Sequence, residues 1–98
     1  MEHIDIEEKE KNADGWVFVV KIGGGEKQTM HEVTLPKNYY DVITGSSVMP
    51  EELIRNSFIF LLERESKESI LGRFYLHEIQ KYFPEYEDDM GRFSEPKG

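Results

Sequence analysis

The segment from Trp16 to Ile22 constrains the fold more than any other part of this chain. All of it except Lys21 is apolar, and aromatic and β-branched side chains dominate it, which predicts a β-strand. Asp14-Gly15 precedes the segment and Gly23-Gly24-Gly25 follows it, and both favour tight connections between strands. Because apolar side chains alternate onto both faces, we expect a central strand that is covered at least partly on each side.

Two further segments have the character of strands. His3 to Ile6 alternates polar and apolar residues, and Thr29 to Leu35 forms a return strand that Pro36 ends. The charged run from Glu7 to Lys11 separates the first strand from the turn before Trp16. Short connections favour antiparallel neighbours in sequence order, so the chain predicts a three-stranded antiparallel meander.

The spacing of the apolar residues changes from that of a strand to that of a helix after Pro36. Residues 38–43 predict a short helix, and a longer one is expected from Pro50 to Arg64, with proline in its first turn. Ile59 lies on the polar side of this longer helix and is the one residue that breaks its pattern. The wide apolar arc opposite contains Leu53, Ile54, Ser57, Phe58, Phe60, Leu61 and Leu62.

Two more short helices are expected over residues 67–74 and 76–83, before Pro84. Residues 85–98 are acidic, so we expect a flexible tail after a single α+β domain of residues 1–84. The predicted fold class is α+β, a three-stranded antiparallel sheet with one long helix and two or three short helices packed on it. The expected core comprises Trp16, Phe18, Val20, Val33, Leu35, Leu53, Ile54, Phe58, Leu61, Ile70, Phe74 and Ile79.

The composition limits the cellular compartments and the classes of binding partner that fit this chain. The chain carries 12 Lys and Arg against 20 Asp and Glu, a formal net charge of −8, and shows no basic cluster that would favour nucleic acid. Cysteine is absent, which excludes disulfides and thiolate metal sites and fits a reducing compartment. No apolar run approaches the roughly 20 residues of a membrane helix, and no signal peptide is visible. We therefore expect a cytoplasmic protein that does not contact membranes.

No residue pattern indicates a metal or nucleotide site. The three histidines, His3, His31 and His77, lie on different predicted elements and lack metal-ligand spacing. The run Gly23–Gly25 does not open onto a helix that carries Lys-Ser or Lys-Thr, so it predicts a hairpin loop rather than a phosphate-binding loop.

Carboxylates and serines are also better explained without catalysis. Glu63 and Glu65 flank Arg64 and fit an ordinary solvated helix end. A catalytic carboxylate needs a pocket that perturbs its pKa, and a domain this small needs its apolar residues for the core. No serine lies in a nucleophile-elbow motif. We therefore expect a protein that is not an enzyme and needs no cofactor.

Aromatic residues are dense at Tyr39-Tyr40 and again between Tyr82 and Tyr86. Adjacent aromatic residues on a helix cannot all face one core, and exposed tyrosine is favoured in protein interfaces. The alternative is that these rings hold the short helices onto the sheet. The sequence thus predicts a protein-binding module or a chain that self-associates as a dimer, with an interface that includes Tyr39, Tyr40, Ile59, Tyr82 and Tyr86.

Four motifs of the chain occur together in one known family: Val33-Thr34-Leu35-Pro36, Tyr40, Glu52-Leu53-Ile54-Arg55 and Phe60-Leu61-Leu62-Glu63. With these residues, part of the chain resembles the ribbon-helix-helix repressors, in which two chains pair one strand into a ribbon that enters the DNA major groove. The resemblance implies a DNA-binding transcriptional regulator, with Thr34 and His31 as its contacts. It covers about a third of the chain, and the strand carries no Lys or Arg to read base edges.

A broader resemblance is to a family of short uncharacterised prokaryotic α+β proteins. It spans most of the chain and implies only a fold, because a fold does not determine a function. The residues that carry it are Leu35-Pro36, Tyr39-Tyr40, Pro50-Glu51-Glu52-Leu53, Phe60-Leu61-Leu62-Glu63-Arg64-Glu65, Ser69-Ile70-Leu71 and Tyr82-Phe83-Pro84-Glu85-Tyr86.

Overall fold

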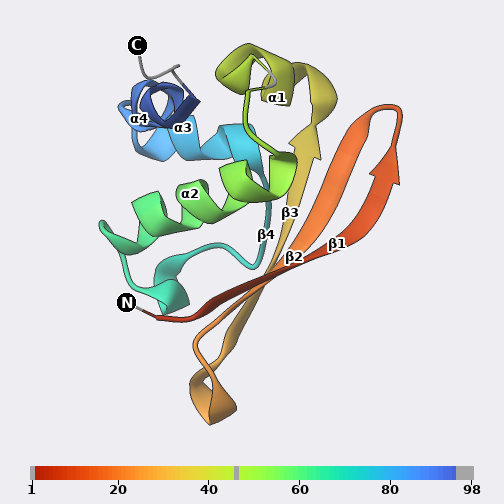
Figure 1. Ribbon diagram of the computed structural model, residues 1–98. Coiled ribbons are helices and arrows are strands. Elements are labelled where there is room, and N and C mark those ends of the chain that lie inside the picture. The colour runs from red at the N-terminus through yellow and green to blue at the C-terminus, as the bar shows by residue number, and fades with distance from the viewer. Residues whose placement is uncertain (1, 46, 95–98) are drawn as a thin grey trace.

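A computed structural model describes residues 2–45 and 47–94 of the chain (Figure 1). Within these residues, one mixed sheet has the strand order β1-β2-β3-β4. Its strands are β1 (Ile4–Asn12), β2 (Gly15–Ile22), β3 (Thr29–Pro36) and β4 (Arg73–Tyr75). The helices are α1 (Lys37–Thr44), α2 (Pro50–Leu62), α3 (Ile79–Tyr82) and α4 (Tyr86–Ser94), and short 3-10 turns are η1 (Gly25–Lys27), η2 (Lys67–Ser69) and η3 (Leu76–Glu78).

The α+β class is confirmed, and β1, β2 and β3 form the expected antiparallel meander with β2 at its centre. The sheet has a fourth strand that the sequence did not predict, because β4 lies parallel to β3 with Phe74 opposite Val33. The predicted helix over residues 67–74 is wrong, since its first residues form the η2 turn and its last ones join the sheet. Phe74 is buried between two exposed neighbours, which is the period-two pattern of a strand.

β1 is longer than predicted, because it continues through the charged run Glu7–Lys11 as far as Asn12. The run is exposed on an edge strand, where the side chains stay in water while the backbone pairs with β2. A register shift between Glu8 and Glu10 marks a bulge in this strand.

Gly15 begins β2 directly after the turn, as the Asp14-Gly15 dipeptide predicts. Its φ of +142° is a conformation that residues with a side chain rarely adopt. A Cβ atom at this position would lie 2.2 Å from the carbonyl oxygen of Leu35 and 2.9 Å from the amide nitrogen of Lys37. Glycine is therefore what lets the β1–β2 turn approach the end of β3 this closely.

The helices lie on one face of the sheet (Figure 1), and the core fills the space between the two layers. Phe18 and Val33 point into this space and are buried. Val17 and Val19 alternate onto the opposite face and are half-buried. This burial fits the expectation that β2 is covered at least partly on each side.

The predicted core is confirmed except at Trp16, whose ring is half-buried and packs edge-on against Tyr40 with centroids 5.1 Å apart. The hydroxyl of Tyr40 donates a hydrogen bond to the carbonyl oxygen of Val48, so this ring closes the core beside α1. Buried apolar residues that the sequence analysis did not place in the core are Ile4, Ile6, Ile22, Tyr40, Phe60, Leu76, Tyr86 and Met90.

Helix α4 occupies the segment for which the sequence predicted a flexible tail, residues 85–98. Tyr86 and Met90 are one helical turn apart and fully buried, and the Tyr86 hydroxyl lies 2.6 Å from the hydroxyl of Ser57 on α2. The acidic residues of the segment face outward, so a high charge is compatible with a buried apolar stripe. The structure thus places residues 86–94 in the folded domain, while residues 95–98 lie outside the described residues.

Arg64 forms ion pairs that link the end of α2 to the segment that carries α4. Its Nε lies 3.1 Å from a carboxylate oxygen of Glu85, and its Nη2 lies 3.4 Å from one of Asp89. The guanidinium also stands 3.5 Å from the centre of the Phe60 ring. Its Nη1 also lies 3.4 Å from a carboxylate oxygen of Glu63, so this cation pairs with α2's own end as well as with the α4 side of the molecule.

Candidate functional site

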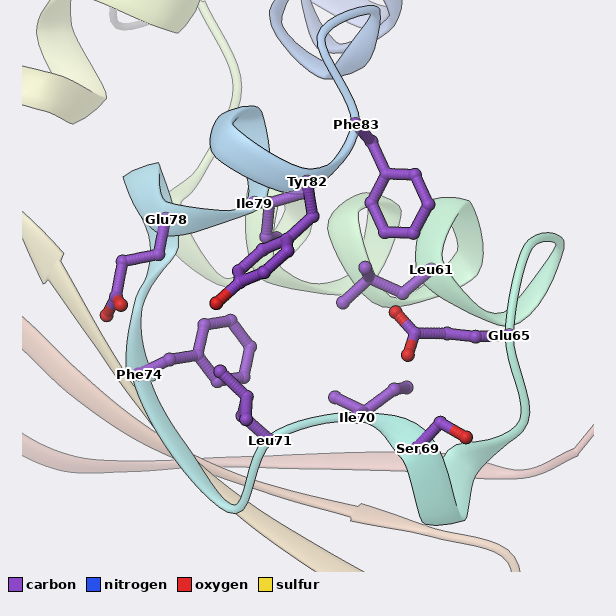
Figure 2. A pocket seen from close by; sticks show the side chains of 10 residues that line it. All are labelled: Leu61, Glu65, Ser69, Ile70, Leu71, Phe74, Glu78, Ile79, Tyr82 and Phe83. Atoms are coloured by element: carbon purple, nitrogen blue, oxygen red, sulfur yellow. The ribbon is translucent and has the colours of Figure 1, made fainter.

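A hollow of about 230 Å³ opens between the end of α2, the segment from Ser69 to Leu71, β4 and α3. Figure 2 shows side chains from all of these elements converging around it. We call this space the apolar hollow, because most of its lining is hydrocarbon. It is lined by Leu61, Glu65, Ser69, Ile70, Leu71, Phe74, Glu78, Ile79, Tyr82 and Phe83.

Buried side chains form the floor of the apolar hollow, and exposed ones form its rim. Leu61 of α2 and Ile79 of α3 belong to the core and also line the hollow. Leu71 and Tyr82 are 49% and 66% exposed and stand at its mouth. Exposed apolar side chains gathered around a concave surface mark an interaction site.

His31 of β3 holds the loop that carries the rim residue Leu71. His31 is buried in β3, and its Nδ1–H donates to the carbonyl oxygen of Leu71 at 2.8 Å. The Thr29 hydroxyl lies 2.9 Å from the other ring nitrogen and satisfies it as a donor. This side chain therefore ties the loop before β4 to the sheet and holds Leu71 at the hollow.

Glu65 is the polar residue that distinguishes this hollow from a simple apolar depression. Its side chain is half-buried, and its carboxylate is directed into the space (Figure 2). It makes no hydrogen bond or ion pair with any residue that the structure describes, and burial raises the pKa of the carboxyl group. Glu65 is thus more buried than Glu63, the other glutamate that flanks Arg64.

Two other polar groups of the apolar hollow, those of Glu78 and Ser69, are engaged elsewhere. The Glu78 carboxylate accepts a hydrogen bond from the backbone N–H of Tyr75 at 2.7 Å and is turned away from the centre of the space (Figure 2). The Ser69 hydroxyl lies 3.1 Å from that of Ser66, within hydrogen-bonding distance. Glu65 is thus the lining residue whose carboxylate is left to meet a ligand.

Glu65 also lines a second hollow of about 490 Å³, on the other side of the chain segment that follows α2. Ile59 and Leu62 supply its apolar part, and carboxylates dominate the remainder, so we call it the acidic hollow. Its one basic lining residue, Lys67, is buried and pairs with Glu2 at 2.6 Å. The full lining is Glu2, Ile59, Leu62, Glu63, Glu65, Ser66, Lys67 and Glu68.

The structure distributes the five predicted interface residues over four environments. Tyr82 stands on the rim of the apolar hollow, and Ile59 is half-buried in the acidic hollow. Tyr40 and Tyr86 lie in the core instead, where they hold α1 and α4 against the rest of the protein. Tyr39 is half-buried between these helices, and its hydroxyl donates to Glu87 of α4 at 3.0 Å. Self-association through these residues stays a prediction.

Within residues 2–45 and 47–94, no group of three or more histidine, aspartate or glutamate side chains is arranged to hold a metal ion. No described helix is both long enough and apolar enough to cross a membrane. His77 is exposed between the rings of Tyr39 and Tyr75, with centroids 5.7 Å and 5.6 Å away, and lines neither hollow.

Comparisons with protein-family models, curated proteins and solved structures found no match. The geometry bears directly on the ribbon-helix-helix resemblance, because β3 is the strand that would form the ribbon. β3 is paired along one edge with β2 over its whole length and along the other with β4 at residues 32–34, so the middle of that second edge is not free for a second chain. His31, which the resemblance would place in contact with DNA, is buried.

Proposed function

We propose that this protein is a non-enzymatic protein-binding module whose ligand site is the apolar hollow. The observation that carries the proposal is a buried apolar floor bordered by two exposed apolar side chains, Leu71 and Tyr82. Many protein interfaces use such a pocket to receive one apolar anchor of the partner. A volume of about 230 Å³ suits a single anchor, because drug-sized ligands fill about 300–1,000 Å³.

The chemistry of the lining favours binding over catalysis. Acid–base and nucleophilic mechanisms rely on at least two groups positioned toward each other, such as a carboxylate pair or a nucleophile with its base. Glu65 is the one lining carboxylate of the apolar hollow that no described residue engages, since Glu78 and Ser69 are hydrogen-bonded to other residues. A single unpaired carboxylate in an apolar setting is suited to holding a cationic group of a partner.

The proposal is tested by affinity capture from the native cell, with nuclease-treated and untreated lysates compared. The baits are the wild-type protein, the double variant Leu71→Ser/Tyr82→Ala, and Val42→Ser, which changes an 84% exposed residue of α1 that lines neither hollow. We expect one partner to be retained by the wild type and Val42→Ser in both lysates and to be lost from the double variant.

The captured partner is then purified and its affinity measured by calorimetry. Truncating interface anchors costs at least 1 kcal/mol, so the double variant should bind at least about fivefold more weakly. A partner held equally by all three baits would reject the apolar hollow as the site. Capture that disappears on nuclease treatment would instead support nucleic acid binding.

A further inference from the structure

The two hollows adjoin at Glu65, which lines both. On one side of its carboxylate lie the buried floor and exposed rim of the apolar hollow, and on the other lie Ile59 and Leu62 with a group of carboxylates. A ligand that fills the apolar hollow and continues past Glu65 therefore passes directly from an apolar surface onto an acidic one.

The charge of the acidic hollow is balanced only in part by the protein itself. The ammonium of Lys67 pairs with Glu2 at 2.6 Å, and the guanidinium of Arg64 pairs with Glu63 at 3.4 Å. Glu65 and the exposed Glu68 have no cationic partner among the residues that the structure describes. These two carboxylates are thus available to positive charge supplied from outside.

We propose that the ligand is a segment of another protein in which an apolar side chain lies within a few positions of a lysine or arginine. This inference rests on the proposed function and specifies the partner. The apolar side chain enters the apolar hollow between Leu71 and Tyr82, and the cation pairs with Glu65 and extends over the acidic hollow. The half-buried setting of Glu65 strengthens this pairing, because a charge pair gains more where water is partly excluded.

Charge complementarity favours such a partner over a second copy of this chain. Each copy carries a formal net charge of −8, so two copies repel at long range, whereas a basic segment is attracted. The apolar hollow alone would accept an uncharged anchor equally well. The adjoining carboxylates are what select a cation beside it.

The experiment is a selection of random peptides displayed on phage against the immobilised full-length protein, run in parallel on three variants. Leu71→Ser/Tyr82→Ala removes the rim, and Glu65→Gln removes the shared charge while keeping the shape. Glu52→Gln is the matched control, because it makes the same change at an exposed position of α2 that lines neither hollow. Circular dichroism and thermal melts establish that every variant is folded.

We expect the wild type and Glu52→Gln to enrich peptides that combine a large apolar residue with a nearby lysine or arginine. Glu65→Gln should keep the apolar preference and lose the basic one. A synthetic peptide of the enriched type should bind Glu65→Gln about tenfold more weakly than the wild type, as expected for loss of one charged hydrogen-bonding partner. High salt should weaken its binding to the wild type more than its binding to Glu65→Gln.

The possible failures are distinguishable. Peptides that depend on Leu71 and Tyr82 but show no basic preference, or that bind Glu65→Gln as tightly as the wild type, would overturn this inference and leave the proposed function standing. Peptides that bind the rim variant unchanged, or no enrichment at all, would overturn both. Sedimentation that shows a dimer lost in the rim variant would make a second copy the occupant and overturn the inference.

Discussion

The burial of Tyr86 can be tested by replacing it with alanine. The ring packs edge-on against Phe60 with centroids 5.3 Å apart, and its hydroxyl lies 2.6 Å from that of Ser57. Truncating a fully buried aromatic side chain costs about 3–5 kcal/mol of unfolding free energy. A domain of this kind has about 5–15 kcal/mol in total, so the change removes a large share of its stability.

Urea unfolding followed by circular dichroism measures these free energies. Tyr82→Ala is the matched control, because Tyr82 lies four residues earlier in the chain and is 66% exposed. We expect a loss of about 3–5 kcal/mol for Tyr86→Ala and no more than about 0.5 kcal/mol for Tyr82→Ala. Tyr86→Phe should cost about 1 kcal/mol, because it removes only the hydroxyl that meets Ser57. Small and equal losses of unfolding free energy in the two alanine variants would refute the docking of α4 and support the flexible tail that the sequence predicts.

Two other properties of the fold have measurable consequences. Gly15→Ala should lower the unfolding free energy by at least about 1 kcal/mol, because the added Cβ meets the Leu35 carbonyl oxygen. Gly72→Ala is the control and should change the stability little, because there is open space around Gly72. Equal melting temperatures for the two variants would contradict the close approach at Gly15. Burial raises the pKa of Tyr86, so the unfolded phenol ionises near pH 10 while the folded one stays neutral. Stability should therefore hold below about pH 10 and fall above it, and Tyr86→Phe should flatten this fall in unfolding measurements across alkaline pH.

Elements whose own residues decide their structure could be predicted from the sequence. β2 is apolar and β-branched along its length, and α2 shows a helical apolar arc after Pro50. The buried positions of Phe18 and Phe58 follow from these two periods alone. Sequence patterns also identified the turn at Gly15, since its chemistry is local.

The remaining elements depend on partners that are distant in the sequence. β4 is extended because the edge of β3 is available to it, and the N–H of Glu32 donates to the carbonyl of Gly72 at 2.8 Å. Tyr86 and Met90 are a weak apolar signal inside an acidic run, and they are buried through contacts with residues of α2 such as Ser57 and Phe60. No local pattern carries that information.

The candidate site was predicted only in part for the same reason. Tyr82 and Ile59 were expected at an interface and do line the two hollows. Glu65 was not recognised, because the residues that bury its carboxylate come from β4, α3 and their flanking segments, which follow later in the chain. A glutamate at the end of a helix has no local signal that separates it from its solvated neighbours.

The parallel pairing of β4 with β3 sets the order in which the chain can fold. β1, β2 and β3 close on one another through short loops, whereas Val33 meets Phe74 only after a crossover that contains α1 and α2. Closing the longer loop costs more chain entropy, so we expect this pairing to form last. This pairing brings three lining residues of the apolar hollow into place, namely Ile70, Phe74 and Ile79, so the hollow is incomplete until the pairing forms. A partner that fills the hollow therefore binds the fully folded chain and does not bind a folding intermediate in which only β1, β2 and β3 have paired.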